Sequence, residues 1–363
     1  MSDPFAPQPM RRGPNWPNRF MLAPMTNKQS HDDGTLGDDE FRWLTMRASG
    51  GFGVTMTCGS HVREAGIGFP GQLGIWSDKH LEGLKRLADT LNSTETHSVV
   101  QLFHAGMRTP KALITGAPEC PSDNEKYGAR GLSTDEVESL KDDFVAAAKR
   151  AEHAGFHGVE LHCAHGYLPC QFLSSRINQR TDQYGGSLEN RARLIFDMVA
   201  QIRAECGPDF SLGVRLSPER FGMRLEEIKQ VAQRLMQNGA IDYLDMSLWD
   251  VFKKPVDDPE GERSLLDHFT SLERGDVKLG AAGNIRSGAD VLRAMSAGLD
   301  FVVIGRGGIL HHDFPKRMQA NPDFECTALP ASAGYLRNEG LSDTFISYMR
   351  NWKGFVEAVE TGS

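Results

Sequence analysis

The sequence predicts an α/β protein built as a single (β/α)8 TIM barrel, with long loops after its strands and a helical tail at its C-terminus. Eight short runs of β-forming apolar residues alternate with longer amphipathic stretches, which indicates a parallel sheet. No Pro/Ser-rich linker or change of composition divides the eight units, so one closed barrel is simpler than two open sheets. We therefore expect one domain over residues 1–363, with the barrel at about 17–318 and the tail at 319–363.

Local patterns predict the elements in order. Strands are expected at 20–24, 53–57, 98–103, 158–162, 211–216, 243–247, 277–281 and 301–304. The clearest helix is 134–154, where apolar residues recur at three- and four-residue steps behind a capping box of Ser133 and Glu136. Further helices are expected at 188–205, 224–238, 287–297 and, in the tail, 342–359.

Two stretches lie outside the repeat of strands and helices. Residues 67–76 and 105–130 are long and rich in Gly, Pro or polar residues, which is typical of lid or pocket-wall loops. Residues 66–71 also match the dinucleotide fingerprint Gly-x-Gly-x-x-Gly. Because this stretch contains a proline and no helical period follows it, we interpret it as a loop over the mouth of the site.

The bulk composition argues against several classes of protein. A net charge of −8 with interspersed acidic and basic residues gives no basic stripe, so no nucleic-acid partner is expected. The apolar stretches fall far short of the ~20 residues needed to cross a bilayer, and the N-terminus lacks a secretory pattern. We therefore expect a cytoplasmic protein with no membrane partner, and its six scattered cysteines are expected to be free thiols.

Polar side chains cluster directly after the fourth expected strand. His162, His165 and Tyr167 fall within six residues, at the barrel end where catalytic groups collect. Two imidazoles can donate hydrogen bonds to one developing oxyanion, and a nearby phenol can deliver a proton. Structural histidines that cap a strand are the plain alternative.

A metal site is a second alternative for the same residues. His162 and His165 could bind zinc or iron with Cys163 or Cys170 as a third ligand, as in a metal-dependent TIM-barrel hydrolase. Such an enzyme would need further Asp or His ligands after other strands, where this sequence offers arginine, tryptophan and glycine instead.

Small-residue turns follow the seventh and eighth expected strands. These turns contain Gly283-Asn284 and Gly305-Arg306. TIM barrels bind phosphate at this place through backbone N–H groups, and Arg306 adds a directed positive charge. The turns therefore predict a phosphorylated cofactor or substrate, unless the glycines serve only the turn geometry.

Residues 154–168, AGFHGVELHCAHGYL, and 178–191, NQRTDQYGGSLENR, carry the most diagnostic motifs of the chain. They resemble the Old Yellow Enzyme or NADH:flavin oxidoreductase family, and the resemblance covers about residues 17–318. It implies an FMN-dependent ene-reductase that binds FMN non-covalently, takes NADPH or NADH as reductant and reduces an unsaturated small-molecule substrate. The different-class alternative is the metal-dependent hydrolase.

The resemblance also implies roles for individual residues. It assigns FMN contacts to Ala23, Pro24, Met25, Thr26, Gly59, Gln101, His162, Arg215, Gly283, Asn284, Gly305 and Arg306. Arg215 matches the basic residue beside flavin N1 and O2, where a fixed cation stabilises the reduced ring. Thr26 places the chain in a branch that carries threonine where other relatives carry cysteine.

Substrate roles follow from the same resemblance. His162 and His165 hold the electron-withdrawing oxygen of an α,β-unsaturated carbonyl or nitro compound, hydride from flavin N5 adds to the β-carbon, and Tyr167 protonates the α-carbon. Lys28 stands where one branch has a substrate-contacting tyrosine. Substrate choice is expected to depend on side chains near Lys28, Phe69, Trp76 and Trp249 and in 105–130.

The expected route of electrons follows from the cysteines. A larger subgroup of the family couples the barrel to a four-cysteine iron–sulfur cluster, whereas Cys326 stands alone after this barrel. Electrons are therefore expected to arrive directly from the nicotinamide. The sequence leaves open whether the chain forms a homo-oligomer.

Overall fold

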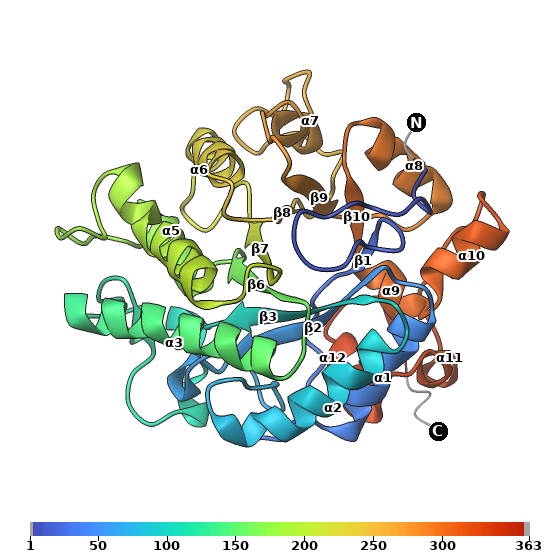
Figure 1. Cartoon of the computed structure of the whole chain (residues 1–363), viewed down its shortest axis with the longest axis horizontal. Coiled ribbons are helices and arrows are strands. Elements are labelled where there is room, and N and C mark those ends of the chain that lie inside the picture. The colour runs from blue at the N-terminus through green and yellow to red at the C-terminus, as the bar shows by residue number, and fades with distance from the viewer. Residues whose placement is uncertain (1–2, 359–363) are drawn as a thin grey trace.

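The computed structural model describes residues 3–358, and its centre is a closed barrel of parallel strands (Figure 1). The strands run around the barrel in the order β1, β10, β9, β8, β7, β6, β3 and β2, and β1 also pairs with β2 to close the ring. Their bounds are β1 Phe20–Leu22, β2 Val54–His61, β3 His97–Phe103, β6 Gly158–Cys163, β7 Ser211–Leu216, β8 Tyr243–Ser247, β9 Lys278–Ala282 and β10 Phe301–Ile304. The predicted (β/α)8 class is confirmed, and each strand overlaps its predicted range.

Helices surround this barrel, as Figure 1 shows. The bounds are α1 Asp38–Ser49, α2 Leu81–Asn92, α3 Thr134–His153, α4 Leu168–Leu173, α5 Leu188–Glu205, α6 Leu225–Gln237, α7 Leu265–Thr270, α8 Gly288–Ser296, α9 Arg306–Leu310, α10 Phe314–Ala320, α11 Ala333–Asn338 and α12 Asp343–Met349. The predicted capping box is present, because the Ser133 side chain accepts the Glu136 backbone N–H and the Glu136 side chain reaches back to the Ser133 N–H. Its two hydrogen bonds fix the start of α3 where the sequence pattern placed it.

The loop after β3 has structure of its own. The short 3-10 helices Gly106–Arg108 and Lys111–Leu113 are followed by the two-stranded pair of β4 (Glu119–Cys120) and β5 (Arg130–Gly131). Two further 3-10 helices, Glu64–Gly66 and Asp78–His80, flank the loop at 67–76. This loop contains no α-helix, as the interpretation of its glycine motif required.

The tail departs from the single helix predicted at 342–359. α12 ends at Met349, and turns follow it. Phe355 is buried, its carbonyl accepts the Ala331 N–H, and the Glu357 N–H donates to the Ala331 carbonyl. This pairing draws the chain alongside Ala331 and overrides the helical periodicity. Residues 1–2 and 359–363 of the expected domain lie outside the described residues.

A buried arginine docks the tail against α1. Arg47 is fully buried and donates to the carbonyls of Glu339 at 2.7 Å and Gly308 at 3.1 Å. Trp43, one turn earlier, meets Phe345 of α12 edge-on with 4.9 Å between ring centroids. Because both contacts hold the tail on the barrel, α12 is fixed beside the ends of the strands.

Aromatic side chains fill the opposite, N-terminal end of the barrel. Trp16 comes from the segment before β1, is fully buried, and packs edge-on against Tyr243 at 5.5 Å and Phe301 at 4.9 Å between ring centroids. Gly213 and Gly280 make room for this packing, since a Cβ at either position would collide with the ring of Tyr243 or Phe301. The site must therefore form at the other end.

Across residues 3–358, no helix combines the length and apolar character that crossing a membrane requires.

Replacing Trp16 tests this aromatic packing. We expect Trp16→Ala to lower the free energy of unfolding by about 3–5 kcal/mol, because truncation leaves a cavity in a dry interior. Trp16→Phe should cost less. Urea unfolding measures both, with Val256→Ala as the surface control because Val256 is 56% exposed. An unchanged midpoint for Trp16→Ala would contradict this account of the barrel interior.

Candidate active site

The C-terminal ends of the strands surround a cavity of about 560 Å³. Its walls come from the loops after β1, β3, β6, β7, β8, β9 and β10 and from the end of the tail. Many of the predicted site residues line it: Ala23, Pro24, Met25, Thr26, His165, Tyr167, Arg215, Gly283, Asn284, Gly305 and Arg306. Residues that are far apart in the sequence thus meet at one rim.

Two predicted cofactor contacts, Gly59 and Gln101, do not line this cavity. They face each other across the β2–β3 pairing. Gln101 is 2% exposed and donates to Glu160 at 2.7 Å, so its amide is engaged within the barrel interior. Their contact with FMN stays a prediction.

His162 and Lys28 also lie one layer away from the cavity wall. His162 is 5% exposed and stands behind His165, with its ring in contact with that of Tyr167. Lys28 places its ammonium 5.3 Å from the ring centroid of Tyr348, and it is Tyr348 that lines the cavity. Both residues reach the cavity only through a neighbour.

The two histidines engage each other. Nδ1 of His165 lies 3.3 Å from Nε2 of His162, and the ring planes are 87° apart. Nε2 of His165 lies 2.6 Å from Oγ of Ser247, whereas Nδ1 of His162 has no hydrogen-bond partner among residues 3–358. Both nitrogens of His165 are thus engaged, so donation to a ligand requires that His165 give up one of these bonds.

Burial keeps the three side chains uncharged. It lowers the pKa of His165 to about 3 and that of His162 well below its ordinary value, with the Arg215 charge acting in the same direction. Burial also raises the pKa of the Tyr167 phenol. At neutral pH the site therefore offers neutral imidazoles, which can still donate one hydrogen bond each, and a protonated phenol.

The turn that carries His165 is held from both sides. His165 and Gly166 have φ values of 60° and 72°, a left-handed conformation that is costly for a residue with a side chain. The His165 N–H donates to Ser217 Oγ at 2.9 Å, and its carbonyl accepts from Nη1 of Arg108 at 2.5 Å. These bonds compensate for the strain and fix the turn.

A buried charge network lies at the base of the cavity. Nε of Arg215 is 3.2 Å from Asp245, and Nη1 of Arg215 has no partner within the part of the chain that the structure describes. Glu160 lies nearby; burial, and then the Asp245 charge, raises its pKa to about 8. An unpartnered guanidinium nitrogen in the wall suits a planar group rich in carbonyl or anionic oxygens, such as a flavin ring.

The turns after β9 and β10 form the other end of the cavity. A Cβ on Gly283 would come within about 3 Å of the 249–251 backbone, so the turn needs glycine, while a Cβ on Gly305 would meet only Ala23, at 3.9 Å. Arg306 donates to the Asn284 side chain at 3.0 Å. A cradle with open backbone and a guanidinium fits a phosphate group, and the cavity as a whole fits FMN.

Several lining residues escaped the sequence reasoning. They are Arg108, Phe221, Ser247, Arg286, Tyr348 and Trp352. Arg286 follows the Gly283-Asn284 turn by two residues, and Arg108 lies in the predicted loop 105–130; their charge was the available signal. Tyr348 and Trp352 belong to the predicted tail helix 342–359, whose aromatic residues suggested that it could cover the barrel, but their place in the wall depends on how the tail docks.

Of the two loops that were expected to wall the site, one lines the cavity and the other does not. The segment 105–130 contributes Arg108, and Trp249 lines the cavity as expected. The segment 67–76 contributes no lining residue. Its Leu73 and Ile75 are buried in the hydrophobic core, and Gln72 donates to the Gly59 carbonyl, so this loop packs against β2 instead.

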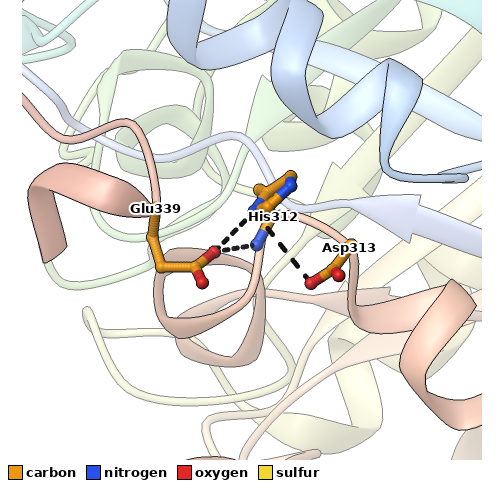
Figure 2. Close-up of side chains that lie close together, drawn as sticks. All are labelled: His312, Asp313 and Glu339. Carbon is orange, nitrogen blue, oxygen red and sulfur yellow. Dashed lines mark hydrogen bonds and ion pairs between the residues drawn. The ribbon is translucent and has the colours of Figure 1, made fainter. Parts of the chain in front are cut away.

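The metal alternative finds no support in the geometry. Within residues 3–358, the grouping of His, Cys, Asp and Glu that could hold an ion is His312, Asp313 and Glu339 (Figure 2), which excludes His162 and His165. In that grouping Nδ1 of His312 lies 2.6 Å from Glu339, and Arg317 pairs with Asp313 at 2.6 Å. The guanidinium already neutralises the acidic charge that would attract a cation.

Comparisons with known proteins identify the family of this chain. A family model described as "NADH:flavin oxidoreductase / NADH oxidase family" matches residues 5–324. A Bacillus subtilis protein named "Probable NADH-dependent flavin oxidoreductase YqiG" is 35% identical over 83% of this chain and 84% of its own. The 12-oxophytodienoate reductase 2 of Arabidopsis thaliana is 30% identical over 84% of this chain and 85% of its own.

Solved structures show the same likeness. The structure of morphinone reductase in complex with tetrahydroNAD has a TM-score of 0.77 and 26% identity, and the match covers 95% of this chain and 97% of that one. Some related proteins are much longer, and this chain spans 36%, 30% and 48% of three of them.

The raised pKa of Glu160 predicts a pH dependence of stability. A carboxyl whose folded pKa is raised contributes stability that is present below its unfolded pKa and is lost as the pH rises through about 8. Glu160→Gln removes this titration, so relative to the wild type it should gain at least about 1 kcal/mol between pH 5 and pH 9. Urea unfolding at several pH values measures the difference. Parallel curves for the two proteins would contradict the shift.

Proposed function

The chain belongs to the NADH:flavin oxidoreductase / NADH oxidase family, and on that premise we propose that it reduces the activated C=C bonds of α,β-unsaturated carbonyl or nitro compounds. As a member of this family it is an FMN-dependent oxidoreductase that uses NAD(P)H. The observation that carries the proposal is the meeting of two neutral imidazoles and a protonated phenol beside a cavity with a phosphate cradle. When bound, FMN supplies the hydride from N5 of its reduced ring.

The residues proposed to hold FMN fall into two groups. Gly283, Asn284, Gly305 and Arg306 would bind the phosphate, through backbone N–H groups and a guanidinium. Arg215 would stand against the ring, where its unpartnered Nη1 can donate to a flavin oxygen. The wall formed by residues 23–26 would pack against the ring.

The catalytic roles concern the substrate side. His162 and His165 would donate hydrogen bonds to the electron-withdrawing oxygen, which polarises the double bond. For this the His165 ring would give up its contacts with Ser247 and His162, so that both imidazoles face the cavity. Tyr167 would give its proton to the α-carbon, and its raised pKa keeps that proton in place until the carbon becomes basic. Lys28 would act on the substrate only through Tyr348.

Two names among the relatives support the reaction class. The proteins named 12-oxophytodienoate reductase and morphinone reductase are reductases by name, and the latter structure holds a nicotinamide analogue. A metal-dependent hydrolase gains no comparable support.

Stopped-flow kinetics on the FMN-loaded protein test the role of Tyr167. We expect Tyr167→Phe to slow flavin reoxidation by 2-cyclohexenone by about 100-fold or more, which is the usual contribution of a positioned acid. Flavin reduction by NADPH or NADH should stay nearly unchanged, because no proton donor is needed there. Equal losses in both half-reactions would refute the role, and a protein that binds no FMN would refute the proposed function as a whole.

A separate measurement tests the imidazole pair. Phenols that bind over an oxidised flavin give a long-wavelength charge-transfer band, and we expect His162→Ala or His165→Ala to weaken the affinity read from this band by about 10-fold or more. The control is Ser271→Ala, because Ser271 lies in the turn after α7 and does not line the cavity. An unchanged phenol affinity would count against oxygen binding by the pair.

A further inference from the structure

The cavity carries a charge opposite to that of the protein. The chain has a formal net charge of −8, yet the charged residues that line the cavity are Arg108, Arg215, Arg286 and Arg306. No carboxylate of the described residues lines it. Four guanidinium groups around one cavity favour anionic ligands.

Two of these arginines, Arg215 and Arg306, have roles in the proposed function, on which this inference rests, and Arg286 lies beside Arg306. Arg286 and Arg306 stand together at the turns after β9 and β10, and their mutual repulsion adds to burial in lowering the pKa of Arg306. A phosphate dianion between them would relieve that repulsion. Arg215 is paired with Asp245 and faces the proposed ring position. Arg108 is left without an assignment.

Arg108 approaches the cavity from a different side. It is the last residue of the 3-10 helix after β3. The backbone of this helix is held by a hydrogen bond from the Met107 N–H to Oε1 of Gln171 at 3.2 Å. Its guanidinium lies 4.6 Å from the ring centroid of Tyr167 and donates once, to the His165 carbonyl. The loop therefore presents this cation beside the proposed proton donor.

Among residues 3–358, the Arg108 side chain donates no hydrogen bond besides the one to His165. No carboxylate lies within 4.0 Å of its guanidinium among the residues that the structure describes. A guanidinium has five N–H donors in a planar fork, so one bond to a carbonyl leaves an edge that can bind a carboxylate through two bonds. The aromatic rings of Trp249, Tyr348 and Trp352 supply apolar surface in the same cavity.

We propose that Arg108 is a specificity-determining residue that binds a carboxylate of the substrate. The substrate class is then an α,β-unsaturated carbonyl compound with a carboxylate a few bonds from the reacting double bond. The fork of Arg108 orients this anion while His162 and His165 hold the electron-withdrawing oxygen. The substrate is then held at two points, at its carboxylate and at its electron-withdrawing oxygen, and this aligns the α-carbon with Tyr167.

Two probes that differ in the charge of one group test the proposal. 3-Maleimidopropionic acid and its methyl ester share one reacting double bond, and the FMN-loaded enzyme is assayed with each. We expect Arg108→Met to lower kcat/KM for the acid by at least about 10-fold and to change the value for the ester less than about 2-fold. Arg108→Lys should keep part of the preference, because it retains the charge but not the fork.

Arg220, an arginine near the opening of the same cavity, provides a matched control. Arg220 lies over Trp249, with 5.3 Å between its guanidinium carbon and the ring centroid, and does not line the cavity. Arg220→Met should leave the ratio of acid to ester unchanged. Flavin absorbance and the melting temperature verify that each variant is folded and loaded.

Four results would overturn the inference, and they are distinguishable. Equal losses for acid and ester with Arg108→Met would make Arg108 a positioning residue for the His165 turn. A loss confined to flavin reduction by NADPH, with NADH unaffected, would assign its charge to the 2′-phosphate of the nicotinamide. A wild-type enzyme that reduces both probes without preferring the acid refutes only the inference, whereas reduction of neither refutes the proposed function as well.

Discussion

The pairing of β1 with both β10 and β2 is the constraint on which the site depends. It places Leu22 opposite Ile304, and the Ala23 N–H donates to the Ile304 carbonyl at 3.0 Å. The first and last turns of the barrel therefore share one rim, so that Ala23 becomes the neighbour of Gly305. An open sheet with the same strands would leave the phosphate cradle and the ring wall at opposite edges.

Burial at this rim determines which of its side chains carry a charge. The imidazoles lose their charge because burial penalises a cation and the nearby guanidiniums repel one. Burial likewise keeps Glu160 protonated, so that the charge of Arg215 is balanced by Asp245 alone. A site that must hold an anionic cofactor thus keeps its fixed positive charge in the arginines and uses neutral donors next to the substrate.

The sequence predicted the parts of the fold that depend on local patterning. The eight apolar runs became the eight strands, and the glycine turns at Gly283 and Gly305 lined the cavity, because barrel geometry fixes which strand ends meet. Sequence reasoning failed where long-range packing decides the outcome. The pattern gave no sign that His165 would contact Ser247, from another strand, or that His162 would lie outside the cavity wall. The tail helix stopped at Met349 because pairing with Ala331 outweighs its periodicity.

The aromatic packing around Trp16 determines how ligands can reach the cavity. Trp16, Tyr243 and Phe301 fill the N-terminal end of the barrel. Reductant and oxidant must therefore enter through the same opening, at the C-terminal end. If both bind over the ring of the cofactor, as the proposed function requires, one must leave before the other binds. Excess of either one would then obstruct the other, and turnover becomes a matter of alternating occupancy.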